Sequence, residues 1–241
     1  MVSTFDELLT QSRSSAEADP EWIGSSEHLR LLTASLGSVF GLADVSLRWG
    51  PRGAAGYWES ATRSIVLERL TVHDGVAPDV ITDATAMSLL HESLHARHST
   101  TLGSYPEARE EMHVLLRRAA EKLFNLLEDG RITTRGIAQH PELSAPLRDF
   151  LNKSGDQITA EARRHGNANT TEPVSQPNQL FYALQMRSLH PDSELVLHPE
   201  VAEKLAAFQP LMNAAQAGST EDCGLTAVRL VEDVMSSGLP N

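Results

Sequence analysis

The feature that most constrains this chain is an H-E-x-x-H pattern that runs from His91 to His95, inside a segment with helical periodicity over 79–98. On a helix, two residues four apart differ by about 40° around the axis, so both imidazoles lie on one face and can bind one ion. Glu92 is turned by about 100° from His91, where it can reach a water bound to that ion but is poorly placed as a ligand. The pattern therefore predicts a zinc site beside a general base. The alternative is a helix that carries two histidines on its solvent face with no chemical role.

A catalytic zinc has three protein ligands and one open position, so a further ligand is needed. The chain has one cysteine, Cys223, so this ligand must be a histidine or a carboxylate. His98 extends the same helix, but three histidines on one helix give poor tetrahedral angles, and we interpret it as a solvated helix end. Thr101 stands where the longer H-E-x-x-H-x-x-G-x-x-H pattern has its third histidine, which excludes that class.

The next predicted helix, over 106–129, carries two adjacent carboxylates, Glu128 and Asp129, just before Gly130, where we expect it to end. Negative charge is unfavourable at the C-terminal end of a helix because of the macrodipole. A bound cation would offset this cost, which makes the pair candidate metal ligands. The alternative is a solvated cap with a surface ion pair, and the spacing alone favours neither.

Taken together, H-E-x-x-H at 91–95 and N-x-x-E-D-x-R-I at 125–132 resemble the zincin-type metallopeptidase module that accompanies von Willebrand A domains in cobaltochelatase T-subunit-like proteins. Related modules occur in phage and bacterial conflict-system proteins. The resemblance covers about 45–132. It implies that His91, His95 and Glu128 bind one Zn²⁺ per chain, that Glu92 is the general base, that Asp129 orients a ligand histidine, and that Asn125 and Arg131 support helix packing.

The chain also departs from these modules. Thr133 follows the Arg-Ile pair, where such modules often have an acidic residue. No D-x-S-x-S signature of a von Willebrand A domain is present. Either such a domain, or an associated ATPase, is a separately encoded partner, or the protein acts without it.

Hydrophobic periodicity outside the site predicts a mostly helical chain with one small sheet. Helical spacing covers 5–16, 26–39, 79–98 and 106–129, and about three further stretches follow 179. Period-two alternation and turn residues predict strands at 45–49, 57–58 and 64–67, as a meander within 44–70. In zincins an edge strand binds extended substrate. The segment 64–69 occupies the matching place, and the alternative for it is an ordinary interior strand.

The fold class expected from these elements is α+β, mostly α. We expect a zincin-like domain over 1–165 with a small N-terminal sheet, a polar, proline-containing loop or linker over 166–179, and a helical extension over 180–241 packed on the domain.

Composition excludes several partners. The formal charge is −12, from 32 acidic and 20 basic residues, so nucleic acid would meet a repulsive field. No apolar run is long enough to span a membrane, the acidic N-terminal segment does not resemble a secretory signal, and the low cysteine content fits a reducing compartment. We therefore expect a cytoplasmic protein without membrane or nucleic-acid partners.

Two functional hypotheses follow. The first is a gluzincin-like zinc metallopeptidase, whose metal-bound water, deprotonated by Glu92, attacks a bond of a peptide or protein substrate. The second is a metal-binding, non-proteolytic interaction module of a larger ATPase, von Willebrand A or defence assembly.

Overall fold

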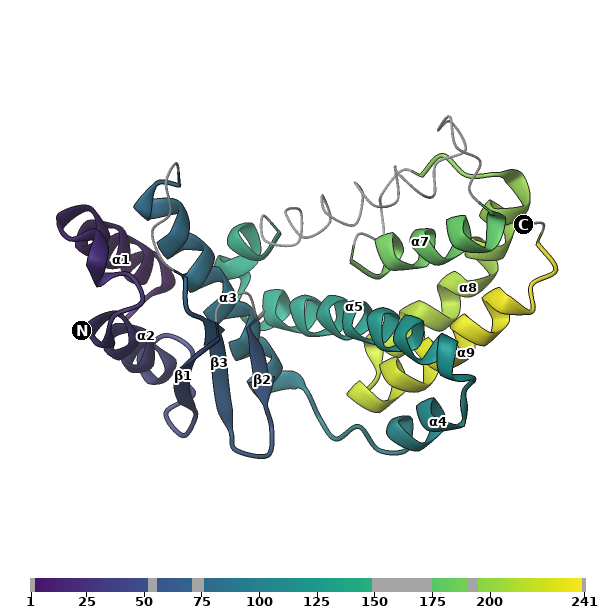
Figure 1. The fold of residues 1–241 in the computed structure, drawn as a ribbon, viewed down its shortest axis with the longest axis horizontal. Coiled ribbons are helices and arrows are strands. Elements are labelled where there is room, and N and C mark those ends of the chain that lie inside the picture. The colour runs from purple at the N-terminus through teal and green to yellow at the C-terminus, as the bar shows by residue number, and fades with distance from the viewer. Residues whose placement is uncertain (1–2, 52–55, 71–75, 149–174, 190–194, 240–241) are drawn as a thin grey trace. The chain divides into compact units, whose positions relative to one another are not determined.

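The structure is a computed structural model of the 241-residue chain, and it describes residues 3–51, 56–70, 76–148, 175–189 and 195–239. The chain divides into two compact units (Figure 1). Unit 1 comprises 1–98 and 140–147, and unit 2 comprises 99–139 and 148–241. Most described residues are helical and one small sheet is present, which confirms the predicted α+β, mostly α, class.

Unit 1 contains the sheet and the helices that precede and follow it. Its elements are α1 (Phe5–Ala18), η1 (Pro20–Trp22), α2 (Ser26–Ser38), β1 (Ser46–Gly50), β2 (Tyr57–Glu59), β3 (Ser64–Glu68), α3 (Pro78–His98) and η2 (Pro141–Leu143). The first two α-helices begin at side-chain caps, because the oxygen of Thr4 accepts from the amide of Glu7 and that of Ser25 accepts from the amide of His28. In the ribbon, α3 packs against β3 and β2 and against α1 (Figure 1).

The sheet has the strand order β1-β3-β2, which corrects the predicted meander. β1 pairs with β3 in parallel, and β2 pairs with β3 antiparallel. The central place of β3 follows from its composition: Ile65, Val66 and Leu67 are all at most 1% exposed, and such an apolar run is typical of a strand covered on both faces. The segment 64–69 is therefore an interior strand in the described sheet, and its prediction as a substrate-binding edge strand is wrong.

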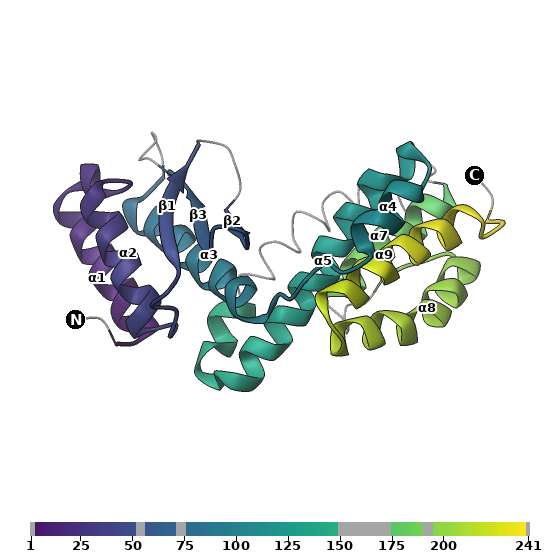
Figure 2. The ribbon, with the colours of Figure 1, turned by 90° about the horizontal axis from the view of Figure 1, so that it is seen from below.

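Unit 2 is a helical bundle. Its elements are α4 (Tyr105–Glu111), α5 (Val114–Gln139), α7 (Gln176–Leu189), α8 (Pro199–Ala217) and α9 (Thr220–Met235). Figure 2 shows α9 lying along α5, and α7 and α8 also pack on α5. The core between these helices is built from fully buried leucines on three of them, Leu123, Leu127, Leu184 and Leu230. Burying such side chains contributes about 1.5–3 kcal/mol each before cavity and entropy costs.

The helix predicted over 106–129 is two helices, and the second passes through Gly130. The chain breaks at Met112, whose backbone is extended and whose carbonyl oxygen accepts from Arg117. Gly130 is buried in mid-helix, and a side chain there would collide with the carbonyl oxygen of Ser188 and the amide of Gln216. Gly130 thus permits close approach between helices, which is a use of glycine other than the predicted helix end.

The two units do not follow the predicted boundary at 165, because 99–139 groups with the C-terminal helices. The predicted linker at 166–179 lies outside the described residues as far as 174, and its last residues are helical because α7 begins at Gln176. No helix in the described part of the chain combines the length and the apolar character needed to cross a bilayer.

Candidate metal centre

The H-E-x-x-H pattern lies in the C-terminal half of α3, which is continuous from Pro78 to His98 and confirms the predicted helix. The imidazole rings of His91 and His95 meet edge to face, with centroids 4.9 Å apart and planes at 87°. Glu92 is 5% exposed. The local sequence thus brings two nitrogen donors together on one helix and places a carboxylate next to them in the chain.

A metal site on α3 needs a further ligand besides the two histidines. Asp129, on α5 in unit 2, carries a partly exposed carboxylate of a type that binds zinc. Two imidazoles and one carboxylate form a donor set that zinc accepts in catalytic sites. The two predicted histidines lie together on α3, whereas Asp129, which the resemblance placed outside the ligand set, belongs to unit 2.

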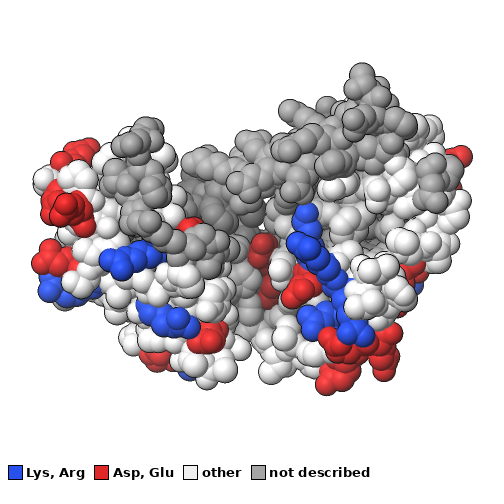
Figure 3. Space-filling view, viewed as in Figure 1, with Lys and Arg blue, Asp and Glu red and all other residues white. Residues whose placement is uncertain are grey.

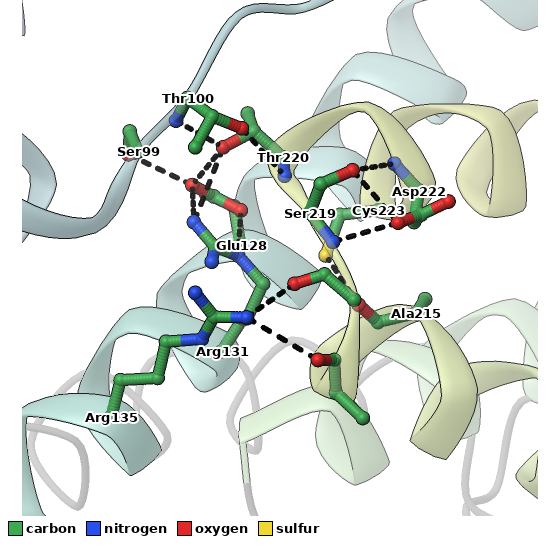
Figure 4. A network of polar contacts seen from close by, with 12 residues as sticks. Ser99, Thr100, Glu128, Arg131, Arg135, Ala215, Ser219, Thr220, Asp222 and Cys223 are labelled. Atoms are coloured by element: carbon green, nitrogen blue, oxygen red, sulfur yellow. Dashed lines mark hydrogen bonds and ion pairs between the residues drawn. The ribbon is translucent and has the colours of Figure 1, made fainter.

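Glu128, the predicted third ligand, has a different environment, within unit 2 (Figure 4). It is 3% exposed, and Arg131 binds both of its oxygens, with Nη2 at 2.6 Å from Oε1 and Nε at 2.7 Å from Oε2. Two hydroxyl groups also donate to Oε1, that of Ser99 at 2.8 Å and that of Thr220 at 2.9 Å. The protein itself therefore supplies four hydrogen bonds to this carboxylate.

These contacts decide the charge state of the pair. Burial by itself raises the pKa of Glu128, but the hydrogen bonds from Arg131, Ser99 and Thr220 and the positive charge of Arg131 outweigh it and hold the pKa below its ordinary value. Burial likewise lowers the pKa of Arg131, and the hydrogen bond and charge of Glu128 more than reverse this. Glu128 and Arg131 therefore form a buried, ionised pair that links α5 to α9 through Thr220.

Cys223 lies in the same network and contributes no thiolate. Its side chain is 0% exposed and its Sγ contacts the carbonyl oxygen of Ala215 at 3.4 Å. Burial and the nearby charge of Glu128 raise the pKa of this thiol to about 12. It stays protonated at neutral pH, so the metal-capable donors of the chain are its histidines and carboxylates.

The sequence analysis also named three further residues near the site, and the structure shows how exposed each of them is. Asn125 is exposed on α5, and Arg131 is fully buried. His98 is 7% exposed, so its interpretation as a solvated helix end is wrong. It lies at the C-terminal end of α3, where its own side chain is buried although that of the preceding Arg97 is exposed.

The sequence analysis did not identify Ser99 or Thr220 as partners of Glu128. One signal was present in the sequence: Ser219 and Asp222 form a capping box that starts α9. This S-x-x-D pattern places Thr220 at the first position of a helix, although nothing local shows that α9 packs on α5.

The chain matches no family model, and no significant match was found among curated proteins or solved structures. The resemblance to the zincin-type module therefore depends on the two motifs and on the arrangement of their residues.

Proposed function

We propose that this protein is a zinc-dependent metallopeptidase with a zincin-like site, in which His91, His95 and Asp129 hold the ion and Glu92 is the general base. The observation that carries the proposal is the H-E-x-x-H pattern on an uninterrupted helix with its two imidazole rings 4.9 Å apart. In this proposal Asp129, whose side chain is partly exposed on α5, supplies the carboxylate.

Asp129 replaces Glu128 as the third ligand in this proposal because the carboxylate of Glu128 is already held by hydrogen bonds from the protein. Glu128 accepts four hydrogen bonds, two of them from a buried guanidinium. Binding to zinc would break this network and leave Arg131 buried without its counter-ion, which costs several kcal/mol. The side chain of Asp129 is partly exposed.

The chemistry divides between the ion and the chain. A bound zinc ion supplies a Lewis acid that lowers the pKa of a coordinated water to about 7. The carboxylate of Glu92 accepts the proton from the attacking water and then passes it to the nitrogen of the leaving amine. Glu92 directly follows His91 in the helix, so this base lies next to a metal ligand. The ion itself is held by other side chains.

The proposed substrate class is a peptide or protein, acted on in the cytoplasm, with a separately encoded ATPase or von Willebrand A protein as the assembly partner. The charge of the chain supports the exclusion of nucleic acid, since the formal value is −12. Acidic and basic side chains are interspersed among the described residues on the face shown in Figure 3.

The ligand set is tested by zinc analysis of protein purified without chelator. We expect about one zinc per chain in the wild type and a loss of zinc in His95→Ala. The decisive pair is Asp129→Asn against Glu128→Gln, because the two residues are neighbours on α5. Asp129→Asn should weaken zinc binding about 10- to 100-fold or more, whereas folded Glu128→Gln should keep it. A folded wild type without zinc, or the reverse order of the two variants, would overturn this ligand set.

The catalytic role is tested with Glu92→Gln, which removes the base and keeps the shape of the side chain. The variant should retain zinc but lose peptide hydrolysis by about 10²-fold or more. Hydrolysis is measured on a mixed peptide library by mass spectrometry, with His95→Ala as the metal-free reference. If zinc is bound but Glu92→Gln hydrolyses peptides as fast as the wild type, or no peptide is cleaved by either, the enzyme proposal fails and the non-proteolytic module is favoured.

A further inference from the structure

Unit 1 contains a pocket of about 260 Å³ on a different face of α3 from the two histidines. The α3 wall consists of Leu90, Ser93, Leu94 and Arg97, spaced i, i+3, i+4 and i+7. This stripe is turned by roughly 130° around the helix axis from His91 and His95. The remaining walls come from the start of α1, the residues after α2, and the segment 140–146.

The body of the pocket is apolar. Phe5 and Phe40 meet there edge to face, with ring centroids 6.2 Å apart, and Leu90, Leu94 and Leu143 complete the lining. A cavity of about 150 Å³ accommodates a benzene ring. The pocket therefore has room for one ring or a branched alkyl group together with a short polar tail.

Ser93 supplies the first polar group of the lining. The residue is 3% exposed, and its Oγ is buried without a hydrogen-bond partner in the described part of the chain. Buried hydroxyl groups are normally paired, so an unpaired one that lines a pocket needs a partner from outside the protein. A ligand that brings an acceptor atom would satisfy this hydroxyl.

Arg97 supplies the positive charge, and two other side chains hold it in place. Its Nη1 lies 2.7 Å from Nε2 of His140, and Nδ1 of His140 lies 3.1 Å from Oε1 of Glu142. Because a guanidinium only donates, Nε2 accepts and the imidazole proton faces Glu142. In this arrangement the imidazole is neutral, so it orients Arg97 without neutralising its charge.

Two carboxylates, Asp6 and Glu142, border the pocket together with Arg97. All three side chains are exposed to solvent, which screens their charges, so the preference for an anion rests on the hydrogen bonds that Arg97 and Ser93 can donate. Asp6 also lies in the first turn of α1, where the helix dipole offsets its negative charge and favours a further anion.

We propose that this pocket binds a small carboxylate with an apolar body, such as an aryl-substituted or branched alkanoate. The carboxylate accepts hydrogen bonds from Arg97 and from the hydroxyl of Ser93, and the apolar body is buried among the phenylalanine and leucine side chains. The site is separate from the proposed metal centre and does not depend on it.

The test is a calorimetric titration of the full chain with 3-phenylpropionate, with 3-phenylpropionamide as the matched neutral probe and 3-phenylpropylamine as the cationic one. The acid should bind, and the amide and amine should bind at least about tenfold more weakly, because only the acid makes charge-assisted hydrogen bonds. Equal binding of acid and amide, or no binding of the acid at millimolar concentration, would overturn the proposal.

Variants assign the binding to the pocket. Arg97→Gln and Ser93→Ala should each weaken binding of the acid, the first by about tenfold or more and the second by severalfold. Arg30→Gln is the control, because Arg30 is a highly exposed arginine on α2 of the same unit. Circular dichroism verifies that each variant is folded. If folded Arg97→Gln binds the acid like the wild type, the pocket is not the site. Zinc content is measured separately, so failure of the metal proposal leaves this result unaffected.

Discussion

α3 and α5 both carry closely spaced polar side chains in their interiors, but the two helices use them in opposite ways. On α5, Glu128 and Arg131 lie three residues apart, are both buried, and bind each other and the hydroxyl of Thr220. On α3, His91 and His95 lie four residues apart and place their rings side by side. The first pair closes on itself as a structural ion pair, whereas the second places two nitrogen donors where we propose that a metal ion binds. Helical spacing predicts that the two side chains of each pair lie close together. It does not show which pair is an ion pair and which is a candidate metal site.

The largest expected effect in this comparison comes from breaking the α5 pair. Arg131→Met leaves Glu128 buried without its counter-ion, which should reduce the free energy of unfolding by about 3–5 kcal/mol. Urea unfolding followed by circular dichroism measures the loss. The control is Arg131→Met combined with Glu128→Met, which removes both charges and should recover most of the stability.

Tryptophan fluorescence gives an internal reference for this experiment. All three tryptophans of the chain, Trp22, Trp49 and Trp58, lie in unit 1, whereas Arg131 lies in unit 2. The fluorescence transition should therefore move less than the circular-dichroism transition. A loss below about 1 kcal/mol for Arg131→Met would show that the pair is not the structural element described here.

The next prediction compares two glycines within helices, one in each unit, that differ in how closely a neighbouring residue of the same unit approaches them. Gly130→Ala on α5 adds a methyl group against the carbonyl oxygen of Ser188 and should cost about 1–3 kcal/mol. Gly37→Ala on α2 is the matched control, because the added carbon would be 3.5 Å from its nearest neighbour there. That substitution should stabilise the protein by about 0.5–1 kcal/mol. Two shifts of the same sign in thermal unfolding would contradict the distinction.

A pH titration of stability tests the charge state of the α5 pair. The pKa of Glu128 is below its ordinary value in the folded protein. Its contribution to stability is therefore fully present above the unfolded-state pKa and is lost as the pH falls through the folded-state pKa. Glu128→Gln should flatten the stability profile in this acidic range. Wild-type and variant profiles of identical slope would show that folding does not lower the pKa of Glu128.

The smallest effect is expected from the helix cap that positions Thr220. Ser219→Ala removes the side-chain acceptor for the amide of Asp222 and should cost about 1 kcal/mol. Ser14→Ala, at an exposed site within α1, should change stability by less than about 0.5 kcal/mol. Thermal unfolding of both variants measures the difference, and equal midpoints would argue against a stabilising cap.

Local pattern accounts for the parts of this molecule that depend on neighbours in sequence. The helix that carries His91 and His95 follows from apolar spacing alone, and so do α1 and α2. The start of α9 is encoded in the same way, because the capping box lies within four residues. The strand positions predicted from the alternation at 45–49 and from the turn residues around the other two strands also agree with the structure to within about two residues.

Pairing between distant segments was not predictable in this way. The parallel pairing of β1 with β3 bypasses β2, which lies between them in sequence, and turn chemistry alone suggested a meander. Gly130 signals a helix end by local rules, and only the approach of Ser188 explains why it lies in mid-helix. Glu128 accepts a hydrogen bond from Thr220, which is 92 residues away in the sequence. The sequence alone therefore could not distinguish a hydrogen-bonded, ion-paired carboxylate at this position from a metal ligand.

Unit 1 is not one continuous stretch of chain, since 140–147 belongs to it while α5 belongs to unit 2. Leu143 and Leu147, 9% and 0% exposed, are among its last core residues. A chain emerges from the ribosome with its N-terminus first, so the sheet and α3 are synthesised before these leucines, with all of α5 in between. The unit therefore completes its core through contacts of high sequence separation, which form slowly. A nascent chain that stops before His140 exposes an unfinished apolar surface, and a fragment that ends at His98 lacks part of the unit.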